Sequence, residues 1–263
     1  MPAGIKYNLN PIEGTMPEML RYETVYRLSG GFNLDITNLS GVGQIPPATP
    51  LFVDFKTRTA KAVINVKAVE ALASNGTSLK VAKNSFAYVN MVIGNGSKIT
   101  TVSAIDKSNA AYDVLTISAL GDAIAKNEVL FEVEAFKITA NVAADATTAK
   151  VTKGAPVKVG DTINIGGIET TVSAIDTSND SYDSLTITAL GTAKSSNAAV
   201  FVVGQQKVTA NTLNYAWTKV ETGATVTAIG RAFEIKESKL IVPVSAKDKE
   251  SLGDRFMFID DEI

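Results

Sequence analysis

Residues 101–121 read TVSAIDKSNAAYDVLTISALG, and residues 171–191 read TVSAIDTSNDSYDSLTITALG. Sixteen of these 21 positions are identical at a constant offset of 70 residues. The offset continues upstream and downstream of this window without a gap; for example, it relates Lys83 to Lys153. Such a match is the signature of a duplicated unit. The sequence therefore predicts two tandem modules that share one fold.

The pattern inside each copy is that of short strands. In the second copy, residues 157–165 alternate apolar and polar side chains, and Gly166-Gly167 follows as a two-residue hairpin signal. Residues 170–175 and 185–190 alternate in the same way, and neither copy has a helical period. We expect a small β-barrel or β-sandwich in residues 76–141 and a second one in residues 146–211.

The flanks, residues 1–75 and 212–263, contain no repeat. They hold 75 and 52 residues, together 127, which is near the usual size of one domain. The predicted fold class is therefore mostly β: a split β-rich base domain with two inserted tandem small β-barrel or sandwich modules. One short helix is expected after Ser245, because Ser245 and Asp248 form a capping pattern and Gly253 is a stop signal. Residues 66–73 fit either a strand or a short helix.

Composition excludes several classes of function. The chain has no cysteine and no histidine, which removes disulfides, thiolate chemistry and the usual general base. A formal net charge of −2 gives no basic footprint, so we expect no nucleic-acid partner. The sequence contains no run of 18 apolar residues and therefore predicts no membrane span. The start of the sequence lacks the apolar core of a signal peptide. We expect a non-enzymatic protein without cofactors, made in the cytoplasm and not exported by that route.

Two loops carry the side chains of a candidate metal site. Residues 106–113 and 176–183 are rich in Asp and Asn, whose oxygens suit Ca²⁺. The candidate ligands are Asp176, Asn179 and Asp183. The alternative is an Asx-type turn that closes a hairpin. The turn is favoured, because the glycine and the distal glutamate of an EF-hand loop are both missing.

The N-terminal segment, residues 7–26, is the main candidate for a subunit or capsid interface. It mixes methionine and tyrosine with arginine, which are side chains that interfaces bury. The candidate interface residues are Met16, Met19, Tyr22, Tyr26 and Arg27, together with Trp217 from the C-terminal flank. An arm that wraps its own domain fits the same composition, and the sequence leaves both possibilities open.

Residues 45–54, Ile-Pro-Pro-Ala-Thr-Pro-Leu-Phe-Val-Asp, lead through a turn to residues 57–63, Thr-Arg-Thr-Ala-Lys-Ala-Val. This run resembles a motif of phage head-decoration proteins, in which a Pro-Ala-Gly-Thr-Pro-Leu-type turn enters a strand and a Thr-Gly-Lys-Ala-type turn leaves it. Ala48 stands where that motif has glycine, and Arg58-Thr59 stand where a glycine is common. The Thr-Val-Ser-Ala-Ile-Asp phrase of the modules is similar to segments of phage head fiber proteins.

The resemblance implies a structural virion protein on the outer surface of a capsid, commonly a homotrimer seated between copies of the major capsid protein. It implies no catalytic residue. The outward modules would then offer attachment to host glycans. Two other classes of function remain: the glycan-binding module of a tail fiber or surface adhesin, and a carboxylate-based glycan hydrolase. The sequence places no pair of carboxylates across a cleft for the last of these.

Overall fold

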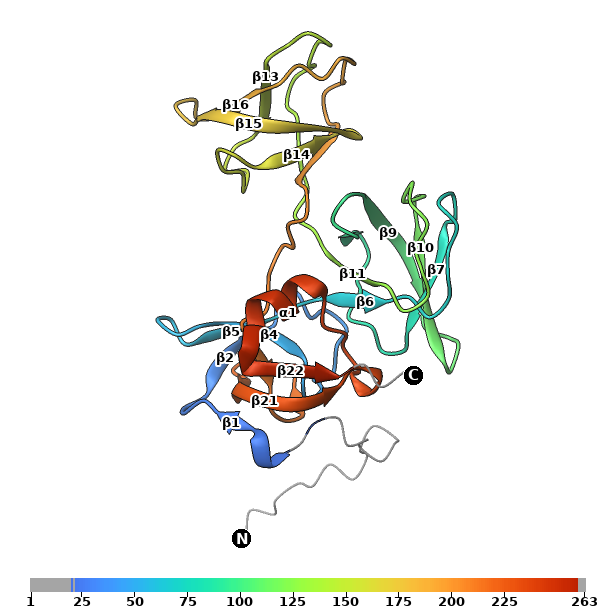
Figure 1. Ribbon diagram of the computed structural model, residues 1–263, viewed down its shortest axis with the longest axis vertical. Helices are drawn as coiled ribbons and strands as arrows, with labels where there is room; N and C mark the ends of the chain where they lie inside the picture. The colour runs from blue at the N-terminus through green and yellow to red at the C-terminus, as the bar shows by residue number, and fades with distance from the viewer. Residues whose placement is uncertain (1–19, 21, 260–263) are drawn as a thin grey trace.

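The structure is a computed structural model that describes Leu20 and residues 22–259. Met16 and Met19, two of the candidate interface residues, lie outside this range. The described chain is mostly β, and its strands form three large sheets and one two-stranded sheet. Figure 1 shows the three parts that these sheets build: a base domain that holds both ends of the described chain, and two modules.

Strands from both flanks interleave in the base domain. Its largest sheet has eight strands in the order β1-β21-β18-β4-β5-β2-β20, with β22 also paired to β21. The strands from the first flank are β1 (Tyr26–Arg27), β2 (Phe32–Asp35), β4 (Pro50–Asp54) and β5 (Thr59–Ala62). Those from the second flank are β18 (Thr212–Asn214), β20 (Thr225–Val226), β21 (Ala228–Lys236) and β22 (Phe256–Ile259).

The pairing of the two flanks confirms the split base domain. β18 pairs with β4, β20 with β2, and β21 with β1, each in antiparallel fashion. A separate pair, β3 (Gln44–Ile45) and β19 (Thr218–Lys219), also joins the two flanks. Three single-turn 3-10 helices complete the domain: η1 (Tyr22–Thr24), η2 (Glu237–Lys239) and η3 (Gly253–Arg255).

The predicted helix is α1 (Ala246–Leu252), and its start is the predicted cap. The hydroxyl of Ser245 accepts a hydrogen bond from the backbone N–H of Asp248, and the carboxyl of Asp248 accepts one from the backbone N–H of Ser245. This reciprocal pair satisfies two of the N–H groups that a helix start leaves open. Gly253, with φ of 58°, ends the helix in a conformation that glycine adopts without strain.

Each module is one six-stranded antiparallel sheet, and the two sheets have the same strand order at the offset of the repeat. In module 1 the order is β6 (Asn65–Lys67), β11 (Val129–Glu132), β8 (Val92–Gly94), β9 (Ile99–Asp106), β10 (Tyr112–Ile117), β7 (Ser78–Ala82). In module 2 the order is β12 (Phe136–Lys137), β17 (Ala199–Val202), β14 (Thr162–Ile165), β15 (Ile168–Asp176), β16 (Tyr182–Ile187), β13 (Thr148–Thr152).

Each sheet curls into a partly closed barrel. The bridge between Ala68 and Val81 joins the chain after β6 to the other edge strand, β7, and Ile138 and Val151 make the same bridge in module 2. The predicted hairpin turn at Gly166-Gly167 is confirmed, because Ile165 pairs with Ile168 on either side of it. The alternative of a short helix over residues 66–73 is wrong, since β6 and the bridge at Ala68 occupy its start.

The strand pairing moves the module boundaries toward the N-terminus. The sheet of module 1 begins at Asn65 instead of 76 and ends at Glu132, and that of module 2 begins at Phe136 instead of 146 and ends at Val202. The expected boundaries come too late because β6 and β12 are too short to show an alternating pattern. Both strands are nevertheless the first of their barrels. Residues 65–75, which the sequence assigned to the first flank, therefore belong to module 1.

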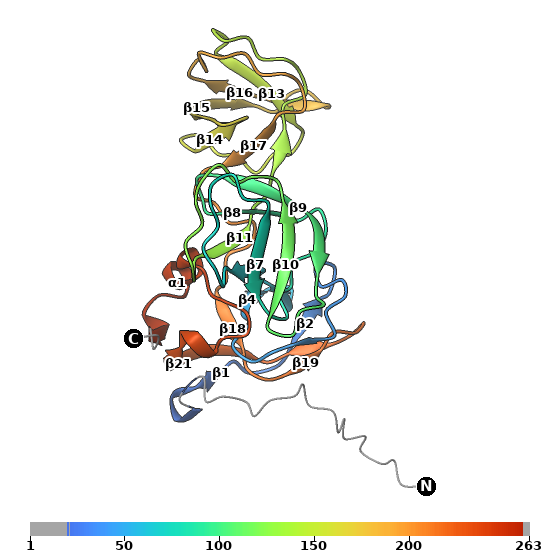
Figure 2. The same cartoon turned by 90° about the vertical axis from the view of Figure 1, so that its right-hand side faces the viewer.

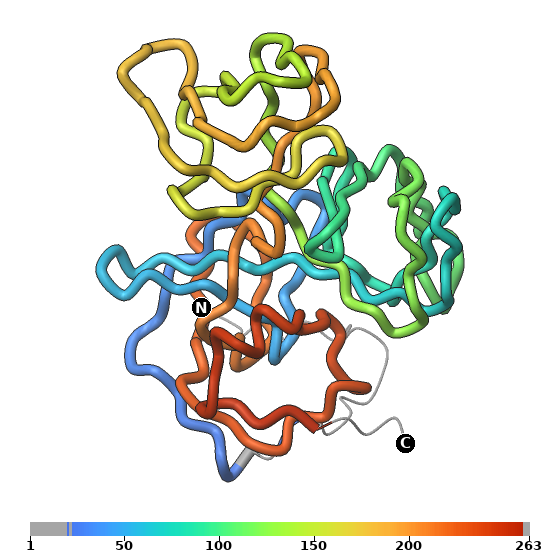
Figure 3. Tube along the Cα trace, turned by 45° about the horizontal axis from the view of Figure 1, so that its top comes forward, coloured from blue at the N-terminus to red at the C-terminus, as the bar shows by residue number. Residues whose placement is uncertain are grey.

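The hydrophobic cores divide differently from the sheets. One core is continuous through the base domain and module 1, since it contains Phe32 and Leu51 together with Leu79 and Leu115. Module 2 has a core of its own around Ile163 and Leu185. A further base-domain core lies between β21 and α1. Figures 2 and 3 show module 2 at the far end of the molecule from β21 and β1, with module 1 beside the base domain.

Candidate binding surfaces and domain junctions

A buried carboxyl group fixes the junction between the base domain and module 1. Asp248, on α1, has no exposed surface. Its Oδ2 accepts a hydrogen bond from Asn65 Nδ2 at 2.7 Å, and its Oδ1 accepts from Gln206 Nε2 at 2.9 Å and from the backbone N–H of Ala210 at 2.8 Å. Asn65 opens the outgoing strand of module 1, and Gln206 lies on the segment that returns from module 2. One side chain therefore ties together the helix and both segments that connect the modules to the base.

A second junction joins module 2 to module 1. Phe131 and Val133 of module 1 pack against Phe201 and the half-buried Val203, their equivalents in the repeat. The backbone N–H of Gly204 donates to the carbonyl of Gly96 at 2.7 Å. Gly96 has a φ of 101°, a conformation that glycine adopts without strain and that other residues rarely adopt, so the backbone at this contact favours glycine.

A polar cluster lies beside this junction. Lys207 Nζ contacts Glu132 Oε1 at 2.7 Å, and the Tyr88 hydroxyl donates to the same oxygen at 2.5 Å. Burial is the main cause that raises the pKa of Tyr88, and the hydrogen bond to Glu132 adds to it. Burial lowers the pKa of Lys207. The hydrogen bond and charge of Glu132, together with the nearby Tyr88 and Glu134, outweigh burial and leave the pKa of Lys207 raised. The cluster therefore keeps Tyr88 protonated and Lys207 charged at neutral pH, as a structural ion pair requires.

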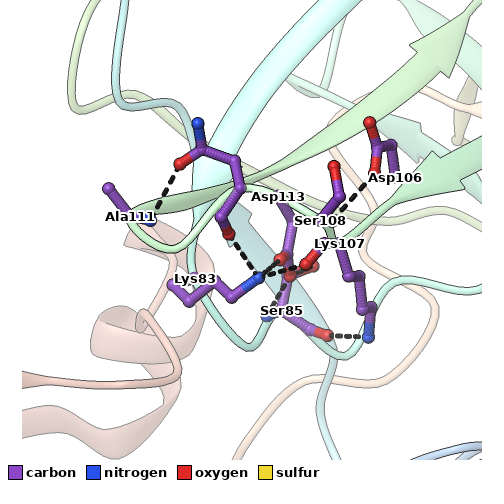
Figure 4. A network of polar contacts seen from close by, with 8 residues as sticks. Lys83, Ser85, Asp106, Lys107, Ser108, Ala111 and Asp113 are labelled. Carbon is purple, nitrogen blue, oxygen red and sulfur yellow. Dashed lines mark hydrogen bonds and ion pairs between the residues drawn. The ribbon is translucent and has the colours of Figure 1, made fainter.

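A lysine fills the loop that the sequence singled out in module 1 (Figure 4). Lys83 Nζ lies 2.9 Å from Asp113 Oδ1, and Asp113 is fully buried. The same ammonium donates to the backbone carbonyls of Lys107 and Asn109, both at 2.7 Å. Asp106 Oδ1 accepts the N–H of Ser108 at 2.8 Å, the hydrogen bond of an Asx turn.

The loop of module 2 repeats this arrangement, which decides between metal site and turn. Lys153 Nζ contacts Asp183 Oδ1 at 2.9 Å and the carbonyl of Thr177 at 2.6 Å. Asp176 Oδ1 accepts the N–H of Ser178, and Asn179 Oδ1 accepts the N–H of Ser181, each at 2.9 Å. Asp183 also accepts the N–H of Gly154 at 2.7 Å, so the three candidate Ca²⁺ ligands together contact one ammonium and three backbone amides. The loops are Asx turns closed around an internal ammonium group, as the favoured of the two alternatives predicts.

These hydrogen bonds also govern the charges of the loops. The backbone N–H of Ser108 lowers the pKa of Asp106, and that of Ser178 lowers the pKa of Asp176. The hydrogen bond from Lys153 is the main cause that lowers the pKa of Asp183. All three carboxylates are therefore ionised well below neutral pH, and their charge is part of the folded turn.

The candidate interface residues partly gather on the base domain. The guanidinium of Arg27 lies 4.9 Å from the centre of the Tyr215 ring, and Tyr26 next to it is 62% exposed. Trp217, two residues beyond Tyr215, is half buried. Tyr22 begins η1, immediately before β1. In Figures 1 and 2, β1 lies at the end of the base domain that faces away from module 2.

Sequence reasoning missed a second aromatic group on the base domain. Phe52 and Phe55 are 43% and 58% exposed, on β4 and in the turn that follows it. The Phe55 and Phe32 rings meet edge to face at 5.6 Å, and the guanidinium of Arg58 lies 4.1 Å from the centre of the Phe32 ring. The alternation of β4 contains the missing signal, because Leu51 and Val53 point inward and Phe52 must therefore point outward.

Comparison with known proteins adds no assignment. No protein-family model matches the chain, and no curated protein matches it. Among the described helices, none has the length and apolar character needed to cross a membrane. In Leu20 and residues 22–259, no group of three acidic side chains is placed to hold a metal ion.

Proposed function

We propose that the chain is a structural virion protein that decorates the outer surface of a phage capsid, and that it has no enzymatic activity. In this proposal the base domain sits on the major capsid protein as part of a homotrimer. The two modules then project outward from the shell. The observation that carries the proposal is the arrangement of the parts, in which a base domain made from both flanks has module 1 beside it and module 2 at the far end of the molecule (Figures 1 and 2).

The junctions support a role in holding and presenting. Asp248 fixes both connecting segments at the base, and the Phe131–Phe201 contact fixes module 2 on module 1. Two segments of chain cross each junction, because the modules are an insertion. An insertion held in this way keeps its orientation better than a domain on a single linker. The modules therefore stand at a defined distance from whatever surface the base domain occupies.

The exposed side chains of the base domain support attachment. Tyr26, Phe52 and Phe55 are large, exposed and aromatic, and Arg27 lies beside Tyr26. Aromatic residues and arginine are enriched where interfaces bury surface, and few such residues carry most of the binding energy. The exposed valines of the modules, Val89 and Val159, are smaller and isolated.

The test compares virions with and without the gene by electron microscopy, and then adds purified protein back to the virions that lack it. We expect the deletion to remove density from the capsid surface and the wild-type protein to restore it. Tyr26→Asp with Phe55→Asp should prevent restoration. Val159→Asp is the matched control, since Val159 is 63% exposed and Tyr26 62%, and it should restore the density normally. Density lost from the tail instead of the head would overturn the proposal in favour of a tail-fiber module.

A further inference from the structure

The sequence contains two Asn-Gly pairs, Asn75-Gly76 and Asn95-Gly96. Asparagine followed by glycine is the pair most prone to deamidation, because glycine has no side chain to obstruct its backbone nitrogen. In this reaction that nitrogen attacks Cγ of the asparagine, ammonia leaves, and a succinimide ring joins the two residues. Water then opens the ring to aspartate or isoaspartate. The structure gives the two pairs unlike surroundings.

The attacking nitrogen is hydrogen-bonded in one pair and free in the other. The backbone N–H of Gly76 donates to the carbonyl of Ala73 at 2.8 Å. Among Leu20 and residues 22–259, the N–H of Gly96 has no hydrogen-bond partner. A hydrogen bond on the nitrogen must break before the nitrogen attacks, which slows the reaction at Gly76 about fivefold relative to that at Gly96.

The side-chain amide of Asn95 is polarised for the attack. Its Oδ1 accepts the N–H of Ser97 at 3.1 Å and that of Lys98 at 2.9 Å. Both donors point at the oxygen on which negative charge develops when Cγ is attacked, and donors placed in this way stabilise such a charge. The Nδ2 of Asn95 donates to Asp122 Oδ2 at 3.4 Å, which restrains the amide further. Asn95 is half-buried and Asn75 is exposed, so exposure alone would give the opposite preference.

The turn at Asn95-Gly96 is part of the junction between the modules. The carbonyl of Gly96 accepts the N–H of Gly204 at 2.7 Å. An ideal Cβ on Gly96 would lie 3.5 Å from Gly204 Cα and 3.7 Å from Phe131 Cζ, which is ordinary van der Waals contact, so the turn lies against both residues. Figure 2 shows β8 and β9, which this turn connects, at the end of module 1 next to module 2. The equivalent position in module 2 is Ile165, which cannot deamidate.

Deamidation changes this turn in two ways. Isoaspartate adds one carbon to the main chain between the Cα of residue 95 and the nitrogen of Gly96, which displaces the Gly96 carbonyl from Gly204. Aspartate and isoaspartate both place a carboxylate beside Asp122, where the neutral amide of Asn95 now lies. Two like charges at this distance repel each other. Both products therefore weaken the hydrogen bond that holds module 2 on module 1.

We infer that Asn95-Gly96 is a site of spontaneous deamidation and that its reaction loosens module 2 from module 1. The chain loses one molecule of ammonia and gains one of water. Hydroxide takes the proton of the Gly96 N–H, and the departing nitrogen takes a proton from water, so the reaction needs no oxidant or cofactor. The inference rests on the junction between the modules and does not depend on the proposed function.

Incubation of the purified full chain in mildly alkaline buffer tests the inference, with the products at both pairs measured by peptide mapping and mass spectrometry. We expect deamidation at Asn95 to be at least about fivefold faster than at Asn75. Hydrogen exchange at the N–H of Gly204 reports the junction, and we expect protection in fresh protein and free exchange in the deamidated fraction. Asn95→Gln closes the ring far more slowly and should keep Gly204 protected through the same incubation. Asn75→Gln is the matched control and should lose protection at the wild-type rate.

Equal or faster deamidation at Asn75 would overturn the inference, and this comparison uses wild-type protein and needs no variant to fold. Continued protection of Gly204 in the deamidated fraction would show that the turn does not hold module 2. Free exchange at Gly204 in fresh protein would remove the contact on which the inference rests. Loss of protection in Asn95→Gln at the wild-type rate would place the cause elsewhere in the chain. All four results are independent of whether the chain binds a capsid.

Discussion

Replacing Asp248 with alanine should destabilise the base domain and module 1 while sparing module 2. The substitution leaves four buried N–H groups without their acceptor, namely one amide N–H each of Asn65 and Gln206 and the backbone N–H groups of Ala210 and Ser245. The other amide N–H groups keep their bonds to the carbonyls of Pro243 and Val208. A buried donor left unsatisfied costs about 1–3 kcal/mol. Taking the low end of that range for each of four donors gives about 4 kcal/mol, a large part of the roughly 5–15 kcal/mol that stabilises a domain.

The assay follows from the separate cores. Trp217 is the one tryptophan of the chain and lies between β18 and β19 of the base domain, so its fluorescence during urea unfolding reports that domain. Far-ultraviolet circular dichroism reports all strands, including those of module 2. We expect Asp248→Ala to lower the fluorescence midpoint strongly and to leave a later dichroism transition, from module 2, in place. Asp254→Ala, an exposed change just after the same helix, is the control and should stay within about 0.5 kcal/mol of wild type. A loss below 1 kcal/mol for Asp248→Ala, or an equal shift of both transitions, would refute the reasoning.

Three further outcomes are expected. Excision of residues 135–204 should leave a chain that folds with an unchanged Trp217 transition, because the N–H of Lys207 already lies 2.8 Å from the carbonyl of Glu132; an unfolded product would show that the base domain and module 1 depend on module 2. Phe131→Ala should cost about 3 kcal/mol and speed proteolysis near Gly204, as followed by mass spectrometry; an unchanged cleavage rate would argue against the packed junction. Acid should weaken module 2. The pKa of Asp183 is lower in the folded chain than its unfolded value of about 3.9, so ionised Asp183 stabilises module 2 fully above that pH. This stabilisation is lost as the pH falls through the folded pKa. Asp183→Asn should therefore flatten the fall of the module 2 melting temperature below about pH 4, and an unaltered slope would contradict this.

Local signals in the sequence predicted local structure well. The repeat fixed two like modules, Gly166-Gly167 marked a hairpin, and Ser245 with Asp248 marked the start of α1. The union of the two flanks in one domain also followed from their lengths, whereas the interleaving of their strands did not. What the sequence did not disclose depends on contacts between distant segments. The partners of Asp248 come from 183 and 42 residues away.

The same limit explains the errors. The first strand of each barrel has two or three residues, which is too short for a pattern, and pairing with a distant strand is what makes it a strand. The Asp- and Asn-rich loops resembled a cation site because they do surround a cation. That cation is Lys83 or Lys153, whose place inside the loop depends on a strand some thirty residues earlier, as the ion pairs with Asp113 and Asp183 record.

The position of the insertion decides how the base domain would respond to tension. The chain leaves through β5 and returns through β18, and both are neighbours of β4 in the middle of the sheet. A pull on module 2 therefore loads two adjacent central strand pairs at once, and not either terminus. Both pairs share β4, so the load from both connecting segments enters the sheet at the same strand. Drag on the outer parts of the molecule is therefore carried by the centre of the base sheet and not by its edges.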